Sequence, residues 1–212
     1  MVEVLIKGGP VMIPLLLCSI IALAISFERI YYLLRSSSDP VKALQAVTLA
    51  VEHKRVTDAV AVVERFRGPI GALAAAGLTA YGKEKADMEQ AIRAAGEREV
   101  GKMEHRLSIL SMIITVAPLL GILGTVTGII KSFGVLARSP QLLDAAALSA
   151  GIAEALLTTA AGLIIAIFTL VLYTYITGII DRRIAEMNDF SSELLEILAA
   201  EVRGSEVRAQ RA

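Results

Sequence analysis

Three long apolar segments constrain this chain more than any other feature of its 212 residues. They cover about residues 10–34, 107–137 and 147–180, and a bilayer core takes roughly 20 apolar residues of helix. Hydrophobic residues make up 55% of the chain, which exceeds the roughly 45–50% of a soluble domain. The pattern predicts an all-α membrane protein with three long transmembrane helices and helical extensions outside the membrane.

The first apolar segment could be mistaken for a signal peptide. It runs from Val11 to Phe27 and continues through "IYYLL", which is too long for the core of a signal peptide. No small-residue cleavage site follows it. We therefore expect a transmembrane helix that stays in the mature protein.

The distribution of basic residues predicts the orientation of the helices. Residues 35–106 contain twelve Lys or Arg residues, and Arg182 and Arg183 follow the third segment directly. The link between the second and third segments has only Arg138, and the N-terminal stretch has only Lys7. Because basic loops stay in the cytoplasm, residues 35–106 and the C-terminus should be cytoplasmic, with the N-terminus outside.

The chain is thus expected to consist of six segments. They are residues 1–34 (N-terminal segment and first span), 35–106 (cytoplasmic helices), 107–137 (second span), 138–146 (short outer link), 147–180 (third span) and 181–212 (amphipathic helix and tail). Within the cytoplasmic segment, Asp39–Pro40 predicts a helix start and Gly68–Pro69 a break. The following helical stretch should run into the second span, with Gly82 as an interruption.

The composition excludes several classes of protein. The formal net charge is zero, which argues against a nucleic-acid partner. A single cysteine, Cys18, and two distant histidines, His53 and His105, offer neither a disulfide framework nor a metal site. Neither histidine lies in an apolar segment, so an intramembrane enzyme with a His-activated nucleophile is not expected. No cofactor is indicated.

Small and polar residues recur at helical spacing in the second and third apolar segments. The second has Pro118, Gly121, Thr125, Gly128 and Ser132, and the third has Gly151, Ala155, Thr158 or Thr159, Gly162 and Ala166. Small residues at this spacing let helix backbones approach closely in lipid. The alternative interpretation is that the threonines only bind carbonyl groups of their own helix.

Two charged residues interrupt these apolar segments, Lys131 and Glu154. If Thr125 and Thr159 lie at one level of two antiparallel helices, the two charges lie roughly 9 and 7.5 Å further outward. We therefore expect an ion pair near the outer end of the helices. The alternative is that both side chains reach the headgroups independently. Neither segment has a carboxylate near its middle, so a proton carrier would have to come from a partner.

Three stretches of the sequence resemble a known family. "GGPVMIPLLLCSIIALAISFERIYYL", "APLLGILGTVTGIIKSF" and "GIAEALLTTAAGLIIAIFTLVLYTYI" are similar to the three membrane segments of the MotA/TolQ/ExbB proton-channel family, in its ExbB/TolQ branch. The resemblance implies a ring in the bacterial inner membrane, a pentamer as in the family. The ring would surround a single-span ExbD/TolR-like partner with an intramembrane aspartate, would use the proton motive force, and would act with a TonB/TolA-like protein.

The resemblance also implies roles for individual residues. Thr125 and Thr159 correspond to the threonines of the ion route, and Glu154 to the glutamate at the outer end. Thr158 is a further candidate ligand, whereas Thr127 lies about 200° around the helix from Thr125 and should point away. The residues expected to serve helix packing are Pro118, Gly121, Gly124, Gly128 and Gly162. Protons are the expected ion, and the alternatives are a sodium-driven motor or a non-conducting membrane scaffold.

Overall fold

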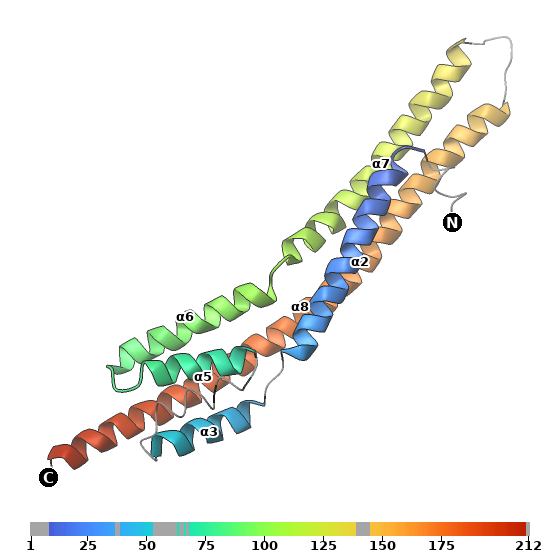
Figure 1. Cartoon of the computed structure of the whole chain (residues 1–212). Coiled ribbons are helices and arrows are strands. Elements are labelled where there is room, and N and C mark those ends of the chain that lie inside the picture. Colours follow the sequence, from blue (N-terminus) through green and yellow to red (C-terminus); the bar gives the residue numbers. More distant parts are fainter. Residues whose placement is uncertain are drawn as a thin grey trace. The chain divides into compact units, whose positions relative to one another are not determined.

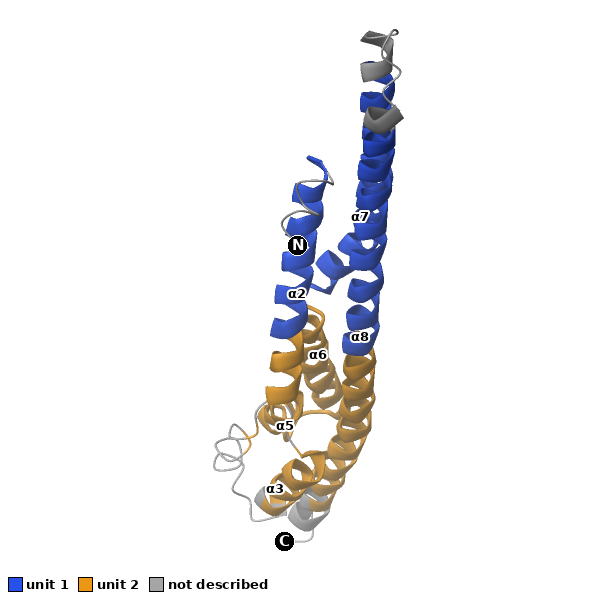
Figure 2. Cartoon of the chain, turned by 90° about the vertical axis from the view of Figure 1, so that its right-hand side faces the viewer, with its two compact units in different colours: residues 1–28, 106–176 blue, residues 29–105, 177–212 orange. Residues whose placement is uncertain are grey.

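The structure is a computed structural model that describes residues 9–36, 39–52, 63, 66, 68–138 and 145–210. Within these ranges it contains helices and turns but no strand. The helices are α2 (Met12–Arg35), α3 (Pro40–Glu52), α5 (Pro69–Thr79), α6 (Lys85–Met103), α7 (Leu107–Arg138) and α8 (Ala145–Gln210) (Figure 1). The chain forms two units, residues 1–28 with 106–176 and residues 29–105 with 177–212 (Figure 2).

Three helices are long and apolar enough to cross a membrane. One is α2, and the other two candidate spans lie within Lys85–Gly134 and Ser149–Gly204. The prediction of an all-helical chain with three long apolar helices is therefore confirmed for the described residues.

Large apolar side chains remain exposed on the candidate spans of the first unit. Phe27 of α2, Ile130 of α7 and Phe168 of α8 are 71%, 65% and 68% exposed. Exposed apolar surface of this extent is unusual for a soluble monomer and is typical of a surface that lipid or another protein covers.

The second unit has a conventional apolar core. In this unit α5 packs on α6, and α3 packs on α5. The C-terminal part of α8 contributes a stripe of buried side chains at helical spacing: Met187, Phe190, Leu194 and Leu198. Gly77 of α5 lies so close to Leu194 that a Cβ atom there would be 2.9 Å from the leucine Cδ2. Because α5 lacks a side chain at this point, it can pack directly against α8.

A buried arginine, Arg29, caps the C-terminal end of α6 within the same unit. Arg29 is only 5% exposed, and its Nη1 donates a hydrogen bond of 2.9 Å to the carbonyl of Lys102 in the last turn of α6. Its guanidinium lies 4.9 Å from the centre of the Tyr32 ring. A cation at a helix C-terminus is stabilised by the helix dipole. Lys102 itself donates to Glu99, and this hydrogen bond raises the pKa of Lys102.

The connection into α7 differs from the expected continuous helix. Gly82 does interrupt the chain between α5 and α6, with φ of 84°. A second interruption follows at residues 104–106, where Arg106 adopts φ of 66°. Within the first unit the Arg106 guanidinium donates to the Glu28 carboxylate at 2.5 Å. Neither glycine nor proline marks this second break, so the sequence pattern did not reveal it.

Candidate functional site

The glycines of α7 bring its backbone into contact with α8 inside one chain. A Cβ atom on Gly121 would lie 3.0 Å from Cα of Thr159, and one on Gly128 would lie 2.9 Å from Cβ of Ala155. From the other helix, a Cβ atom on Gly162 would lie 3.2 Å from Cα of Gly121. These glycine faces are therefore covered by contacts within the single chain.

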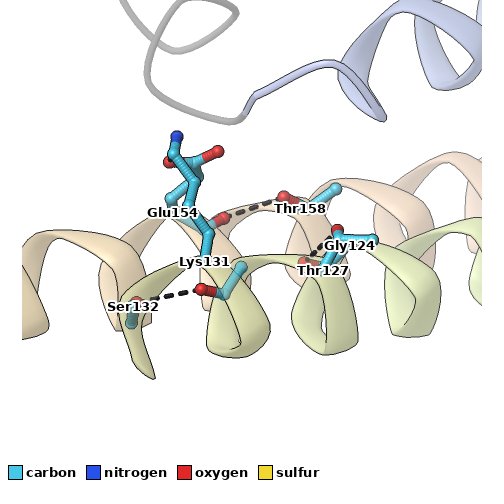
Figure 3. A network of polar contacts seen from close by, with 7 residues as sticks. Gly124, Thr127, Lys131, Ser132, Glu154 and Thr158 are labelled. Atoms are coloured by element: carbon cyan, nitrogen blue, oxygen red, sulfur yellow. Dashed lines mark hydrogen bonds and ion pairs between the residues drawn. The ribbon is translucent and has the colours of Figure 1, made fainter. Parts of the chain in front are cut away.

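Gly124 creates the space that Thr158 occupies. Thr158 is 1% exposed, and its methyl and Cβ atoms lie where a side chain on Gly124 would be. The Thr158 hydroxyl donates a 2.8 Å hydrogen bond to the carbonyl of Glu154, one turn earlier in α8 (Figure 3). Thr158 is thus a packing residue between the two helices in the single chain.

Thr159 makes a hydrogen bond that joins α7 and α8. Its hydroxyl donates to the carbonyl of Gly121 at 2.9 Å, and its side chain is half-buried. Thr159 consequently lies beside Gly121, and its neighbour Thr158 lies beside Gly124. The offset argument for Lys131 and Glu154 took Thr125 and Thr159 at one level, whereas these contacts place Thr159 nearer the start of α7 than Thr125.

Thr125 and Thr127 of α7 bind their own helix. Thr125 is half-buried and donates to the carbonyl of Ile122 at 2.6 Å. Thr127 is exposed and donates to the carbonyl of Leu123 at 2.9 Å. Pro118 lies one turn before Gly121 and its neighbours, inside α7 and half-buried.

The structure contains the ion pair between Lys131 and Glu154 that the sequence analysis expected. Lys131 Nζ lies 3.2 Å from Glu154 Oε2. The Lys131 side chain is 66% exposed, whereas that of Glu154 is only 20% exposed. Figure 3 shows Lys131 and Glu154 together, between Ser132 and Thr158.

Two neighbours of this site were not identified from the sequence as partners. The Ser132 hydroxyl lies against Gly151 and donates to the carbonyl of Gly128 at 2.9 Å. Gly9, which precedes α2, lies against the carboxylate of Glu154. The described residues contain no group of three His, Cys, Asp or Glu side chains that could hold a metal ion.

The sequence of the chain is similar to those of known proteins. Residues 66–189 match the model of a family described as the MotA/TolQ/ExbB proton channel family. The chain is 34% identical over 200 residues to a putative biopolymer transport protein, ExbB-like 1, of Synechocystis, covering 93% of this chain and 78% of that protein.

Two further relatives match a smaller part of their own length. A putative ExbB homologue of Methanothermobacter thermautotrophicus is 32% identical over 184 residues, covering 86% of this chain and 64% of that protein. The Tol-Pal system protein TolQ of Pseudomonas aeruginosa is 36% identical over 117 residues, covering 55% of this chain and 50% of that protein.

Proposed function

The chain belongs to the MotA/TolQ/ExbB proton channel family, and on that basis we propose that it is the channel subunit of a proton-driven complex in the bacterial inner membrane. Flow of protons would drive a partner protein that does work at the cell envelope, as in biopolymer transport or Tol systems. Relatives named ExbB and TolQ support this assignment.

A column of polar groups on α7 and α8 supports the proposal most directly. The Lys131–Glu154 pair lies at one end of the column, and the hydroxyls of Thr125 and Thr159 follow along the same helices. The sequence between Arg106 and Lys131, and between Glu154 and Asp181, contains no charged residue. Hydroxyl groups that bind a passing ion weakly, at several successive positions, suit conduction better than a single ligand that binds the ion strongly.

This column lacks a group that can carry a proton across the middle of the membrane. We therefore propose an ExbD/TolR-like partner with one membrane span, whose intramembrane aspartate passes Thr125 and Thr159. Several copies of this chain, five by analogy with the family, would surround that partner, and a TonB/TolA-like protein would couple the motion to the envelope. The exposed apolar faces of α2, α7 and α8 provide surface for ring contacts and lipid.

Protons are favoured over sodium by the small number of available oxygen atoms. A sodium ion needs several oxygen ligands at once, whereas a proton needs one titratable carrier and hydrogen-bonded steps. Thr158 is 1% exposed, and Thr127 binds its own helix on an exposed face. Of the four threonines Thr125, Thr127, Thr158 and Thr159, this leaves Thr125 and Thr159 as half-buried hydroxyls on α7 and α8.

Reconstitution into vesicles tests this function. The chain would be combined with an ExbD/TolR-like single-span protein, and proton uptake measured under a potassium diffusion potential without sodium. We expect uptake that disappears when the partner's intramembrane aspartate is changed to asparagine. Uptake only when sodium is added would favour the sodium motor, and absence of flux from an assembled complex would favour the scaffold.

A further inference from the structure

Gly9 lies against the outer carboxylate of the proposed ion route. Its φ is +70°, and a Cβ atom built on it would overlap Oε1 of Glu154 and lie 3.2 Å from Cδ of the same carboxylate. A side chain at position 9 would therefore meet both a strained backbone conformation and an occupied space. Glycine satisfies both constraints because it has no Cβ atom.

The position of Gly9 is set by the start of α2. The amide of Met12 donates to the carbonyl of Gly9 at 3.1 Å, and the amide of Ile13 donates to the carbonyl of Pro10 at 3.2 Å. These bonds satisfy amides of the first turn that no helical carbonyl could reach. Residues 9–12 thus form a turn, here called the Gly9 turn, that is continuous with the first span.

The two oxygens of the Glu154 carboxylate face different neighbours. Oε2 accepts the hydrogen bond from Lys131 at 3.2 Å, while Oε1 contacts the Gly9 backbone. The Glu154 side chain is 20% exposed and that of Lys131 is 66% exposed, so the carboxylate is the more buried partner of the pair. The Gly9 turn covers the side of the carboxylate that Lys131 leaves open.

We infer that Gly9 is a positioning residue for Glu154: the turn that begins α2 holds the carboxylate in the orientation in which it pairs with Lys131. The significance of this contact for ion entry rests on the proposed function. The contact adds α2 to the elements that build the outer end of the route, which α7 and α8 would otherwise form alone.

Replacement of Gly9 by alanine tests the inference, with Gly82→Ala as the matched control. Gly82 has a similar φ of +84°, but a Cβ atom added to it would meet no other atom within 4 Å, so its replacement adds strain without displacing a carboxylate. We expect Gly9→Ala to lower proton uptake by the reconstituted complex about tenfold, with assembly intact. Gly82→Ala should conduct normally. Equal uptake by both variants would overturn the inference.

A second variant separates positioning from a general structural defect. Glu154→Asp shortens the side chain and withdraws the carboxylate from the space that an alanine at position 9 would take. Gly9→Ala combined with Glu154→Asp should therefore conduct better than Gly9→Ala alone. If the fold-reduction in proton uptake of the double variant equals the product of the two single fold-reductions, the two residues are not in direct contact.

Cysteine crosslinking tests the contact without relying on conduction. In a Cys18→Ser background, Gly9→Cys with Glu154→Cys should form a disulfide on oxidation. Ile13→Cys with Glu154→Cys should not, because Ile13 is 66% exposed. Absence of the first crosslink would refute the inference. A crosslink together with normal flux in Glu154→Ala would instead refute the proposed role of Glu154 in ion entry.

Discussion

Adjacent threonines of α8 serve two different purposes. The Thr158 hydroxyl binds a carbonyl of its own helix, whereas the Thr159 hydroxyl reaches the carbonyl of Gly121 on α7. Neighbouring residues are about 100° apart around a helix, so the two side chains necessarily face different surroundings. At Thr159, replacing the hydroxyl changes both the helix contact and the polar column of the proposed route.

Thr159→Val should abolish proton uptake while the complex still assembles, because valine keeps the shape of threonine without its oxygen. Thr158→Val should conduct and lose only about 1 kcal/mol of stability, the usual value of one buried hydrogen bond. Flux in vesicles and thermal unfolding in detergent measure the two effects. Normal flux in Thr159→Val with loss in Thr158→Val would show that the route lies on the other face.

The Lys131–Glu154 pair should behave as one unit. Either single change, Lys131→Glu or Glu154→Lys, places two like charges side by side and should reduce flux. Their combination should restore part of the loss, with a coupling energy of about 0.5–1 kcal/mol for a partly exposed pair. A double-mutant cycle on flux measures this energy, and simple additivity would show that the two charges act independently.

At the scale of helices, close backbone contact is the main feature of α7 and α8. Gly162→Ala should separate the two helices, because its new methyl group would lie 2.5 Å from the carbonyl oxygen of Ala117, which belongs to the backbone and cannot rotate away. We expect a loss of about 1–3 kcal/mol, typical of overpacking. Gly178→Ala in the same helix is the control.

A Cβ atom on Gly178 meets nothing within 4 Å, so Gly178→Ala should be neutral or slightly stabilising through helix propensity. Unfolding of the purified protein in detergent, followed by circular dichroism, compares the two variants. Equal stability would mean that α7 and α8 do not approach each other at Gly162.

The end of α6 depends on a side chain from α2. Arg29→Gln should destabilise the second unit by about 1–3 kcal/mol, since it removes a charged, buried hydrogen bond to the carbonyl of Lys102. Arg93→Gln is the matched control, because Arg93 is 77% exposed along its side chain and lies 4.0 Å from Glu97. If both variants have the same stability against unfolding, Arg29 has no structural role.

The sequence was sufficient to predict features that follow from periodicity. Apolar length identified the spans, and the two charges within otherwise apolar segments identified the Lys131–Glu154 pair, although Thr125 and Thr159 do not share the level that the offset argument assumed. The contact of Gly9 with Glu154 could not be predicted, because no local pattern relates residues that lie so far apart in the chain. The break at Arg106 was missed because its stabilising partner, Glu28, also lies far away in the chain.

At the scale of the whole molecule, the orientation across the membrane is predicted from the distribution of Lys and Arg residues. In a Cys18→Ser background, Lys83→Cys lies in the turn between α5 and α6 and should be protected from a membrane-impermeant thiol reagent in intact spheroplasts. Ser149→Cys, exposed near the start of α8, should react. Lysed spheroplasts provide the control for reactivity, and the reverse labelling pattern would invert the proposed orientation.

The glycine contact between α7 and α8 also has a consequence for biogenesis. These helices are neighbours in the chain, so the local concentration of one beside the other is high and independent of expression level. The hairpin should form as soon as both spans have left the translocon. Ring formation would then be a later step whose rate depends on the concentration of folded hairpins in the membrane. A low concentration would delay the ring, but the glycine faces would stay covered and so would not be exposed to chaperones or proteases.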